Sequence, residues 1–190
     1  MIPLFSGLIP GMELMMSSPL RVRKVAAGFT LPEVILVCVI IGVAAAIAIP
    51  RFASWLPSYR LHSAAQDLLA NFQLAKVNAV KRNANCTVSF NLAIGGKIWD
   101  YVISVDSDNN EIYDNGETVL LKKQWKDYRD VFFDTSHGID SSGIGFANTP
   151  PSVAFYPNGL PSAGGTIYLK NTKGKTVRVA LSEAGNLQIN

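Results

Sequence analysis

Residues 28–51 read GFTLPEVILVCVIIGVAAAIAIPR, and they predict the first element of the fold. From Val34 to Pro50 no residue is charged, and Arg51 ends the apolar run. A helix over these residues rises about 25 Å, which is at the short end of the length that spans a bilayer. Adding Phe29–Glu33 brings the segment to the usual length, so we expect residues 29–50 to form a transmembrane helix.

Basic residues flank the amino-terminal side of this segment. Arg21, Arg23 and Lys24 precede it, and neither Asp nor Glu occurs between Ser17 and Pro32. Positive charge beside the first apolar segment holds that end in the cytoplasm. The sequence therefore predicts a single-pass membrane protein with a cytoplasmic amino terminus, whose remaining chain lies across the membrane.

Small residues come before the apolar run rather than after it. Ala26, Ala27 and Gly28 precede it, whereas Pro50-Arg51-Phe52 behind it lacks the small-residue pattern of a signal-peptide cleavage site. A cut at the small residues leaves the apolar helix on the mature protein. This order argues against a secretory signal peptide.

The order of glycine, aromatic residue, glutamate and apolar run resembles a known processing site. Gly28-Phe29-Thr30-Leu31-Pro32-Glu33 is similar to the motif of type IV pilins and of the pseudopilins of type II secretion. The resemblance implies a leader peptide at residues 1–28, cleavage between Gly28 and Phe29 by a membrane-embedded prepilin peptidase, and N-methylation of Phe29. Pro32 departs from the family pattern, but proline is tolerated in the first turn of a helix. Translation from an internal methionine, as an alternative, would leave a shorter basic leader.

Glu33 is the one charged residue between Val25 and Pro50. A carboxylate costs about 2.5–3.5 kcal/mol near the bilayer centre and less near the interface, so Glu33 is either a tolerated boundary charge or a functional one. The resemblance favours a role in assembly. Removal of the leader creates an ammonium group on Phe29, methylation preserves its charge, and Glu33 would pair with the Phe29 amine of a neighbouring subunit.

The helical pattern continues beyond the membrane. An apolar stripe at steps of three and four residues indicates one face of a helix, so we expect residues 51–83 to form an amphipathic helix that continues the first. The combined helix should run from about Leu31 to Arg82, with Pro50 and Pro57 kinking or breaking it. The stripe is expected to lie in the protein core and comprises Leu61, Ala65, Leu68, Phe72, Ala75 and Ala79.

Residues 84–190 show the alternation and turn signals of a β-rich domain. Strands are expected at residues 86–92, 101–105, 117–123, 128–134, 152–156, 166–170, 176–181 and 186–189. The predicted fold class is therefore α+β, with a long amino-terminal helix, half in the membrane and half amphipathic, packed on one or two antiparallel sheets. Residues 73–83 and 155–190 resemble the subfamily of minor pseudopilin H and fimbrial minor pilins, which also implies a pilin-like fold.

This resemblance implies a minor pseudopilin, a structural subunit of the filament of the type II secretion system. It places the chain in the inner membrane with its carboxyl-terminal domain in the periplasm, and gives other pilin-like subunits and the prepilin peptidase as partners. The alternative is a minor pilin of a type IV pilus that contacts DNA during uptake, because a basic cluster on the last long hairpin could hold phosphates. That cluster comprises Lys170, Lys173, Lys175 and Arg178.

The overall charge argues against a nucleic-acid partner. The whole chain has a formal net charge of +3, and after removal of residues 1–28 it carries 14 basic and 13 acidic side chains, a net charge of +1. Such a balance gives no general attraction to nucleic acid. We therefore expect a solvated hairpin rather than a DNA-binding site.

One acidic stretch has the spacing of a calcium loop. In residues 106–117, DSDNNEIYDNGE, oxygen-bearing side chains occur at loop positions 1, 3, 5, 9 and 12, which are Asp106, Asp108, Asn110, Asp114 and Glu117. Glu111 occupies the sixth position, where glycine normally allows a sharp turn. We expect a polar hairpin tip that binds no ion, with calcium as the weaker alternative.

No pattern of a catalytic site accompanies these features. His62 and His137 are the two histidines, and neither belongs to a metal or nucleophile motif. Cys38 lies in the predicted membrane helix and Cys86 outside it, so we expect two free thiols, with Cys86 buried in a strand. The sequence predicts a protein that is not an enzyme and that needs no cofactor.

Overall fold

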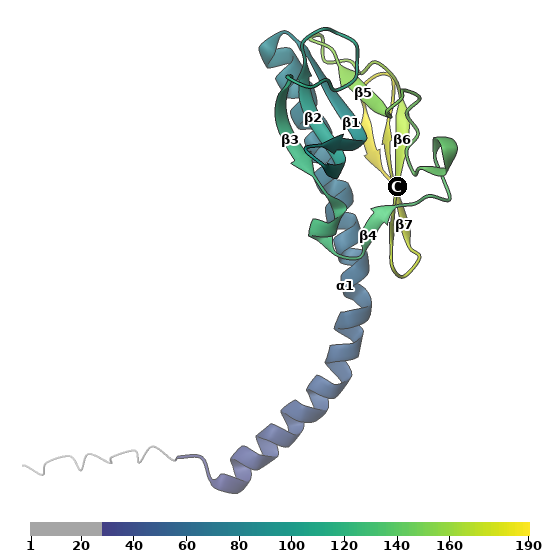
Figure 1. Cartoon of the computed structure of the whole chain (residues 1–190). Helices are drawn as coiled ribbons and strands as arrows, with labels where there is room; N and C mark the ends of the chain where they lie inside the picture. Colours follow the sequence, from purple (N-terminus) through teal and green to yellow (C-terminus); the bar gives the residue numbers. More distant parts are fainter. Residues whose placement is uncertain (1–27) are drawn as a thin grey trace, which may run out of the picture. The chain divides into compact units, whose positions relative to one another are not determined.

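The structure is a computed structural model that describes residues 28–190 (Figure 1). The predicted leader, apart from Gly28, lies outside the described residues. The first described element is helix α1, Leu31–Arg82, which has 52 residues. Glu33 in its first turn and Lys81 and Arg82 in its last turn complement the helix dipole. These bounds confirm the helix predicted from the sequence.

Neither proline ends the helix. Pro50 and Pro57 both lie inside α1, so of the two expected outcomes, a kink or a break, the break does not occur. A proline removes one backbone donor, and the hydrogen bonds of the adjoining turns remain to hold the helix together. Pro57 is also buried, which favours the helical conformation at that point.

The chain divides into two units between Ala44 and Ala45, and the second unit is Ala45–Asn190. Within the second unit, the predicted apolar stripe of α1 is part of the hydrophobic core. Leu61, Leu68 and Phe72 are at most 1% exposed, and the alanines between them, Ala65 and Ala75, are fully buried. Since alanine adds little bulk, the strands can approach the helix backbone closely here.

Two four-stranded antiparallel sheets pack beside this half of α1 (Figure 1). The first has the order β3-β2-β1-β5 and consists of β1 (Asn85–Ile94), β2 (Lys97–Asp106), β3 (Thr118–Lys123) and β5 (Ser152–Phe155). The second has the order β4-β6-β7-β8 and consists of β4 (Val131–Phe133), β6 (Gly165–Asn171), β7 (Thr176–Leu181) and β8 (Leu187–Ile189). The predicted α+β class is thereby confirmed.

An aromatic cluster joins the helix to the first sheet and to the loop before β5. The ring of Phe72 on α1 lies 6.1–6.4 Å, between centroids, from the rings of Phe90, Phe146 and Phe155. Phe90 also stacks on Phe146 at 5.8 Å. Alternate residues of β1 point to this core, as the sequence pattern predicted, and Cys86 among them is a buried free thiol.

One predicted strand is only partly formed. Of residues 128–134, only Val131–Phe133 form a strand, because the preceding residues Trp125–Tyr128 make a turn of 3₁₀ helix. The Trp125 side chain is buried, and its backbone N–H donates to the carboxylate of Asp100 at 2.7 Å. Because burial of Trp125 holds residues 125–128 in the 3₁₀ turn, they cannot extend the strand.

Candidate processing and assembly site

The start of α1 brings the predicted processing and assembly residues together. The backbone N–H of Thr30 donates to the Glu33 carboxylate at 3.4 Å, and Val34 N–H donates to the Thr30 carbonyl at 3.1 Å. A glutamate three residues after a threonine that precedes a helix is the spacing of a capping box, in which the acid satisfies an otherwise unpaired donor. Sequence reasoning missed this local role of Glu33, although the Thr-x-x-Glu spacing signals it.

The residues on either side of the predicted cleavage point are open to their surroundings. The Phe29 side chain is 79% exposed, and no atom lies within 4 Å of the point where a Cβ on Gly28 would stand. Gly28 and Phe29 precede the first helical residue, so the bond between them is not protected by helical hydrogen bonds. Cleavage and methylation at this position stay predictions.

The apolar surface of the first part of α1 is uncovered in the isolated chain. Its most apolar window has a mean hydropathy of 2.6 and no buried residue, which is long and apolar enough to cross a membrane. Phe29, Leu31, Ile41 and Ile49 are each at least 61% exposed. Such a surface needs lipid or the equivalent helices of neighbouring subunits to cover it.

The acidic loop between β2 and β3 folds into a compact turn. Carboxylate oxygens of Asp106, Asp108 and Glu117 lie within 4.8 Å of one another. Backbone donors already engage them: Asn109 and Glu111 N–H groups donate to Asp106 at 2.7 and 2.9 Å, and Ser107 N–H donates to Glu117 at 2.8 Å.

Asn110 presents its amide nitrogen to the other acids of this loop. Its Nδ2 donates to the carboxylates of Asp108 and Asp114, and its Oδ1 accepts from the Ile112 N–H at 2.9 Å. The structure thus brings all five predicted residues to one loop, but Asn110 offers a donor where a cation would need an oxygen. Whether the loop binds calcium stays untested, and the expectation that it binds no ion stays a prediction.

Glu111 does not prevent the sharp turn, contrary to our expectation. Its φ of +67° is in the left-handed region that glycine usually supplies. Two distant side chains hold it there, because the Tyr156 hydroxyl donates to the Glu111 carboxylate and the Ser152 hydroxyl donates to the Glu111 carbonyl at 2.7 Å. The hydrogen bond that Tyr156 donates to Glu111 is the main reason that the pKa of Tyr156 is raised.

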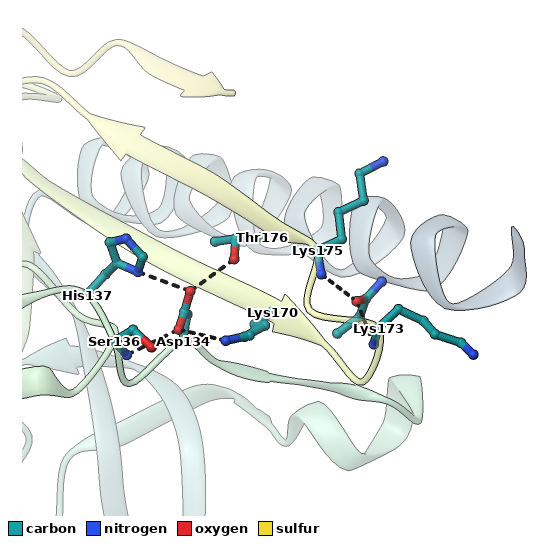
Figure 2. A network of polar contacts seen from close by, with 8 residues as sticks. Asp134, Ser136, His137, Lys170, Lys173, Lys175 and Thr176 are labelled. Carbon is teal, nitrogen blue, oxygen red and sulfur yellow. Dashed lines mark hydrogen bonds and ion pairs between the residues drawn. The ribbon is translucent and has the colours of Figure 1, made fainter. Parts of the chain in front are cut away.

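A buried acid, Asp134, contacts one residue of the basic cluster at the β6–β7 hairpin (Figure 2). The sequence analysis did not predict this contact. Asp134 is 2% exposed, and its carboxylate lies 3.7 Å from the Lys170 ammonium. The Thr176 hydroxyl donates to it at 3.0 Å, and the His137 ring contacts it at 3.1 Å. Lys170 is therefore turned toward Asp134, whereas Lys173 and Lys175 extend away from this network.

Hydrogen bonds dominate the electrostatics of Asp134. Burial alone would raise the pKa of this carboxyl group, but the Ser136 backbone N–H, the Thr176 hydroxyl and the Lys170 ammonium outweigh it and lower the pKa to about 2. Asp134 is thus ionised throughout the neutral range and ties β6 and β7 to the loop after β4. No property of residues 128–137 alone reveals this, because Lys170 and Thr176 are 36 and 42 positions away.

The histidines and cysteines considered in the sequence analysis do not come together in one site among residues 28–190. His137 stacks on Tyr168 with 4.8 Å between ring centroids, and His62 is exposed on α1. Cys38 is exposed and Cys86 buried, and both are free thiols, as predicted.

Two family models match parts of this chain. Residues 64–185 match the family described as type II transport protein GspH, and residues 23–49 match the prokaryotic N-terminal methylation motif. The pilin-like protein PilA1 of Thermus thermophilus is 29% identical over 168 residues, which cover 85% of this chain and 97% of that protein.

Two solved structures are also similar. The minor pseudopilin EpsH of the Vibrio cholerae type 2 secretion system has 12% identity and a TM-score of 0.44, over 69% of this chain and 96% of that one. The type IV minor pilin FimU of Pseudomonas aeruginosa has 19% identity and a TM-score of 0.47, over 70% of this chain and 90% of that one.

Proposed function

This chain belongs to the GspH family of type II transport proteins, and from that premise we propose that it is a minor pseudopilin, a structural subunit of the type II secretion filament. The observation that carries the proposal is the pair of family matches. One covers most of the domain built from the second half of α1 and the sheets, and the other covers the predicted cleavage point and the apolar helix.

Processing at Gly28 is proposed to switch on assembly. Cleavage before Phe29 by a prepilin peptidase creates an ammonium group directly before α1, and methylation of that nitrogen keeps its positive charge. Glu33 lies in the first turn of the same helix, and only one of its two carboxylate oxygens is engaged by Thr30. The other oxygen is available to the Phe29 amine of a neighbouring subunit, so the two charges can neutralise each other among apolar helices.

The apolar part of α1 is proposed to have two successive surroundings. Before assembly, lipid of the inner membrane covers its exposed side chains, with the amino terminus in the cytoplasm and the domain of the two sheets in the periplasm. After assembly, the same side chains pack on the helices of other pilin-like subunits. The large exposed apolar surface supports both steps, because no other part of residues 28–190 covers it.

The role proposed is structural and not catalytic. The family is one of transport components, and within the described residues the side chains nearest to a reactive constellation, Asp134, His137 and Thr176, connect strands to a loop. We also propose that the acidic loop is stable without calcium, because backbone N–H groups already donate to Asp106 and Glu117.

The second candidate, a minor pilin that contacts DNA, has support from the similarity to a pilin-like protein. The hairpin offers less positive charge than its sequence indicates, since Lys170 faces the Asp134 carboxylate. We therefore rank the secretion role above DNA uptake.

Deletion of the gene followed by complementation tests the proposal. We expect the deletion strain to lose export of proteins that use type II secretion while surface pili and DNA uptake remain normal, and we expect the intact chain to restore export. A strain complemented with Glu33→Val serves as the assembly control and should export poorly. Normal export combined with lost DNA uptake would instead establish the second candidate.

A further inference from the structure

Several turns of the sheet domain lie near Arg60, where the buried part of α1 begins. Arg60, near the start of the buried part of α1, donates to Asp130 at 2.8 Å, and the Asp130 carbonyl accepts from Thr172 N–H at the β6–β7 turn. The β1–β2 turn reaches the same region, because the Gln124 side chain beside the 3₁₀ helix donates to the Ile98 carbonyl at 2.6 Å. Arg60 follows the apolar run by only ten positions, so these turns form the membrane-proximal end of the domain.

Exposed basic side chains collect at this end. The β1–β2 turn contributes Lys97, the 3₁₀ helix and the residue after it contribute Lys126 and Arg129, and the β6–β7 turn contributes Lys173 and Lys175. Figure 2 shows the last two lysines pointing away from the protein, and Figure 1 shows their turn extending beyond β4. We call these five residues the basic collar.

Most acids of the same region are paired with a cation or accept a backbone hydrogen bond. Asp130 pairs with Arg60 and Asp67 pairs with Lys123 at 3.1 Å. Asp134 is buried against Lys170, and Asp100 accepts from the Trp125 backbone. Among the side chains that the structure describes here, Asp127 is the one exposed acid whose negative charge is left near the basic collar.

The opposite end of the domain carries the opposite charge. Asp106 pairs in register with Asn85, just beyond the end of α1, which puts the acidic loop at the far end of the ten-residue strand β1 from Lys97. Ten strand residues span about 30 Å, several times the screening length at physiological ionic strength. The domain is therefore polarised along α1, with positive charge toward the membrane and acids away from it.

An aromatic stripe on α1 adjoins the collar. Phe52, Trp55 and Tyr59 follow the apolar run directly, are 69%, 56% and 55% exposed, and contact one another at 6.4 and 5.2 Å between ring centroids. Their spacing of three and four residues puts them on one face of the helix. Trp and Tyr rings in this position are typical of the interface between a bilayer and water.

We propose that the basic collar docks the domain on anionic lipid headgroups while the subunit is membrane-embedded and not yet assembled. The aromatic stripe lies in the headgroup layer, and Lys97, Lys126, Arg129, Lys173 and Lys175 contact lipid phosphates around it. Docking holds the sheet domain close to the bilayer, and assembly into a filament releases it. The inference requires anchoring through α1 but is independent of which filament the subunit joins.

Lysine acetylation of the full mature chain tests this docking. One chain per nanodisc is labelled with an N-hydroxysuccinimide ester in discs of phosphatidylcholine with and without phosphatidylglycerol, and each lysine is followed by mass spectrometry. We expect Lys97, Lys126, Lys173 and Lys175 to react several-fold more slowly in the anionic discs and to recover at high salt, because headgroup attraction is screened. Lys81, an exposed residue in the last turn of α1, is the internal control and should react equally in both discs.

Variants separate the collar from general charge effects. Lys173→Gln with Lys175→Gln should weaken docking by about fivefold per lysine and so restore labelling of Lys97 and Lys126 in anionic discs. The matched control, Lys81→Gln with Arg82→Gln, removes the same charge at the other end and should change nothing.

Three results would overturn the proposal. Equal labelling in both kinds of disc would show that the collar does not touch anionic lipid. Protection that needs more than one chain per disc would assign the collar to a neighbouring subunit, and protection by duplex DNA but not by lipid would assign it to nucleic acid.

Discussion

Replacing Asp134 by asparagine tests how the β6–β7 hairpin is held in place. The pKa of this carboxyl group is lowered from 3.8 to about 2 by its hydrogen bonds and by Lys170. A difference of this size between the folded and unfolded states corresponds to about 2 kcal/mol of folding free energy near neutral pH. Asp134→Asn keeps the shape of the side chain but removes the charge, so we expect the domain to lose about that amount.

The pH dependence has a defined sign. Because the folded-state pKa lies below the unfolded-state pKa, the unfolded chain takes up the proton first as the pH falls. The contribution of Asp134 is therefore complete above about pH 5, declines as the pH falls toward 2, and is absent below the folded pKa. The stability difference between wild type and Asp134→Asn should shrink over the same interval, while other carboxyl groups affect both proteins alike.

Urea unfolding of the full chain in detergent measures this difference. Tryptophan fluorescence, to which the buried Trp125 contributes, reports on the domain, and the expected loss of about 2 kcal/mol lowers the urea concentration at the unfolding midpoint. Asp127→Asn removes an exposed acid nearby and should change stability by less than about 0.5 kcal/mol. The reasoning is refuted if Asp134→Asn costs no more than this control, or if its effect is the same at pH 7 and pH 3.

Three further outcomes are expected. Glu33→Val should insert in the membrane at least as well as wild type but should crosslink poorly to neighbouring subunits in isolated filaments, and normal incorporation would remove the proposed pairing with Phe29. Phe72→Ala, which empties the centre of the aromatic cluster, should destabilise the domain by about 3–5 kcal/mol in the same urea assay, and a loss below about 1 kcal/mol would contradict the described core. A fragment beginning at Pro57 should fold as a soluble monomer that binds neither calcium nor DNA tightly, so a large rise in Tm with millimolar calcium, or a DNA affinity that disappears when Lys170, Lys173, Lys175 and Arg178 are changed, would count against this account.

The helix and most strands could be predicted because their signals are local. The 3.6-residue spacing from Leu61 to Ala79 and the alternation in residues 86–92 depend only on which side chains face the core. The bounds Leu31–Arg82 follow from the apolar run at one end and from the change of periodicity near Asn83 at the other. At Pro50 and Pro57 the sequence left open whether the helix breaks, because local propensity does not include the hydrogen bonds of the adjoining turns.

The parts of the candidate sites that escaped prediction depend on partners distant in the chain. Glu111 adopts its left-handed conformation with the help of Ser152 and Tyr156, which are 41 and 45 positions away. Asp134 meets Lys170 only because β4 pairs with β6. The capping bond between Thr30 and Glu33, in contrast, depends only on the local T-x-x-E spacing, so the sequence alone could have predicted it.

The proposed identity as a processed filament subunit depends most directly on where the mature chain begins. Intact-mass analysis of the protein purified from its native membrane measures this. The account predicts a chain that starts at Phe29 and carries one additional methyl group. A mature terminus beyond Pro50, which would remove the apolar helix, would contradict it.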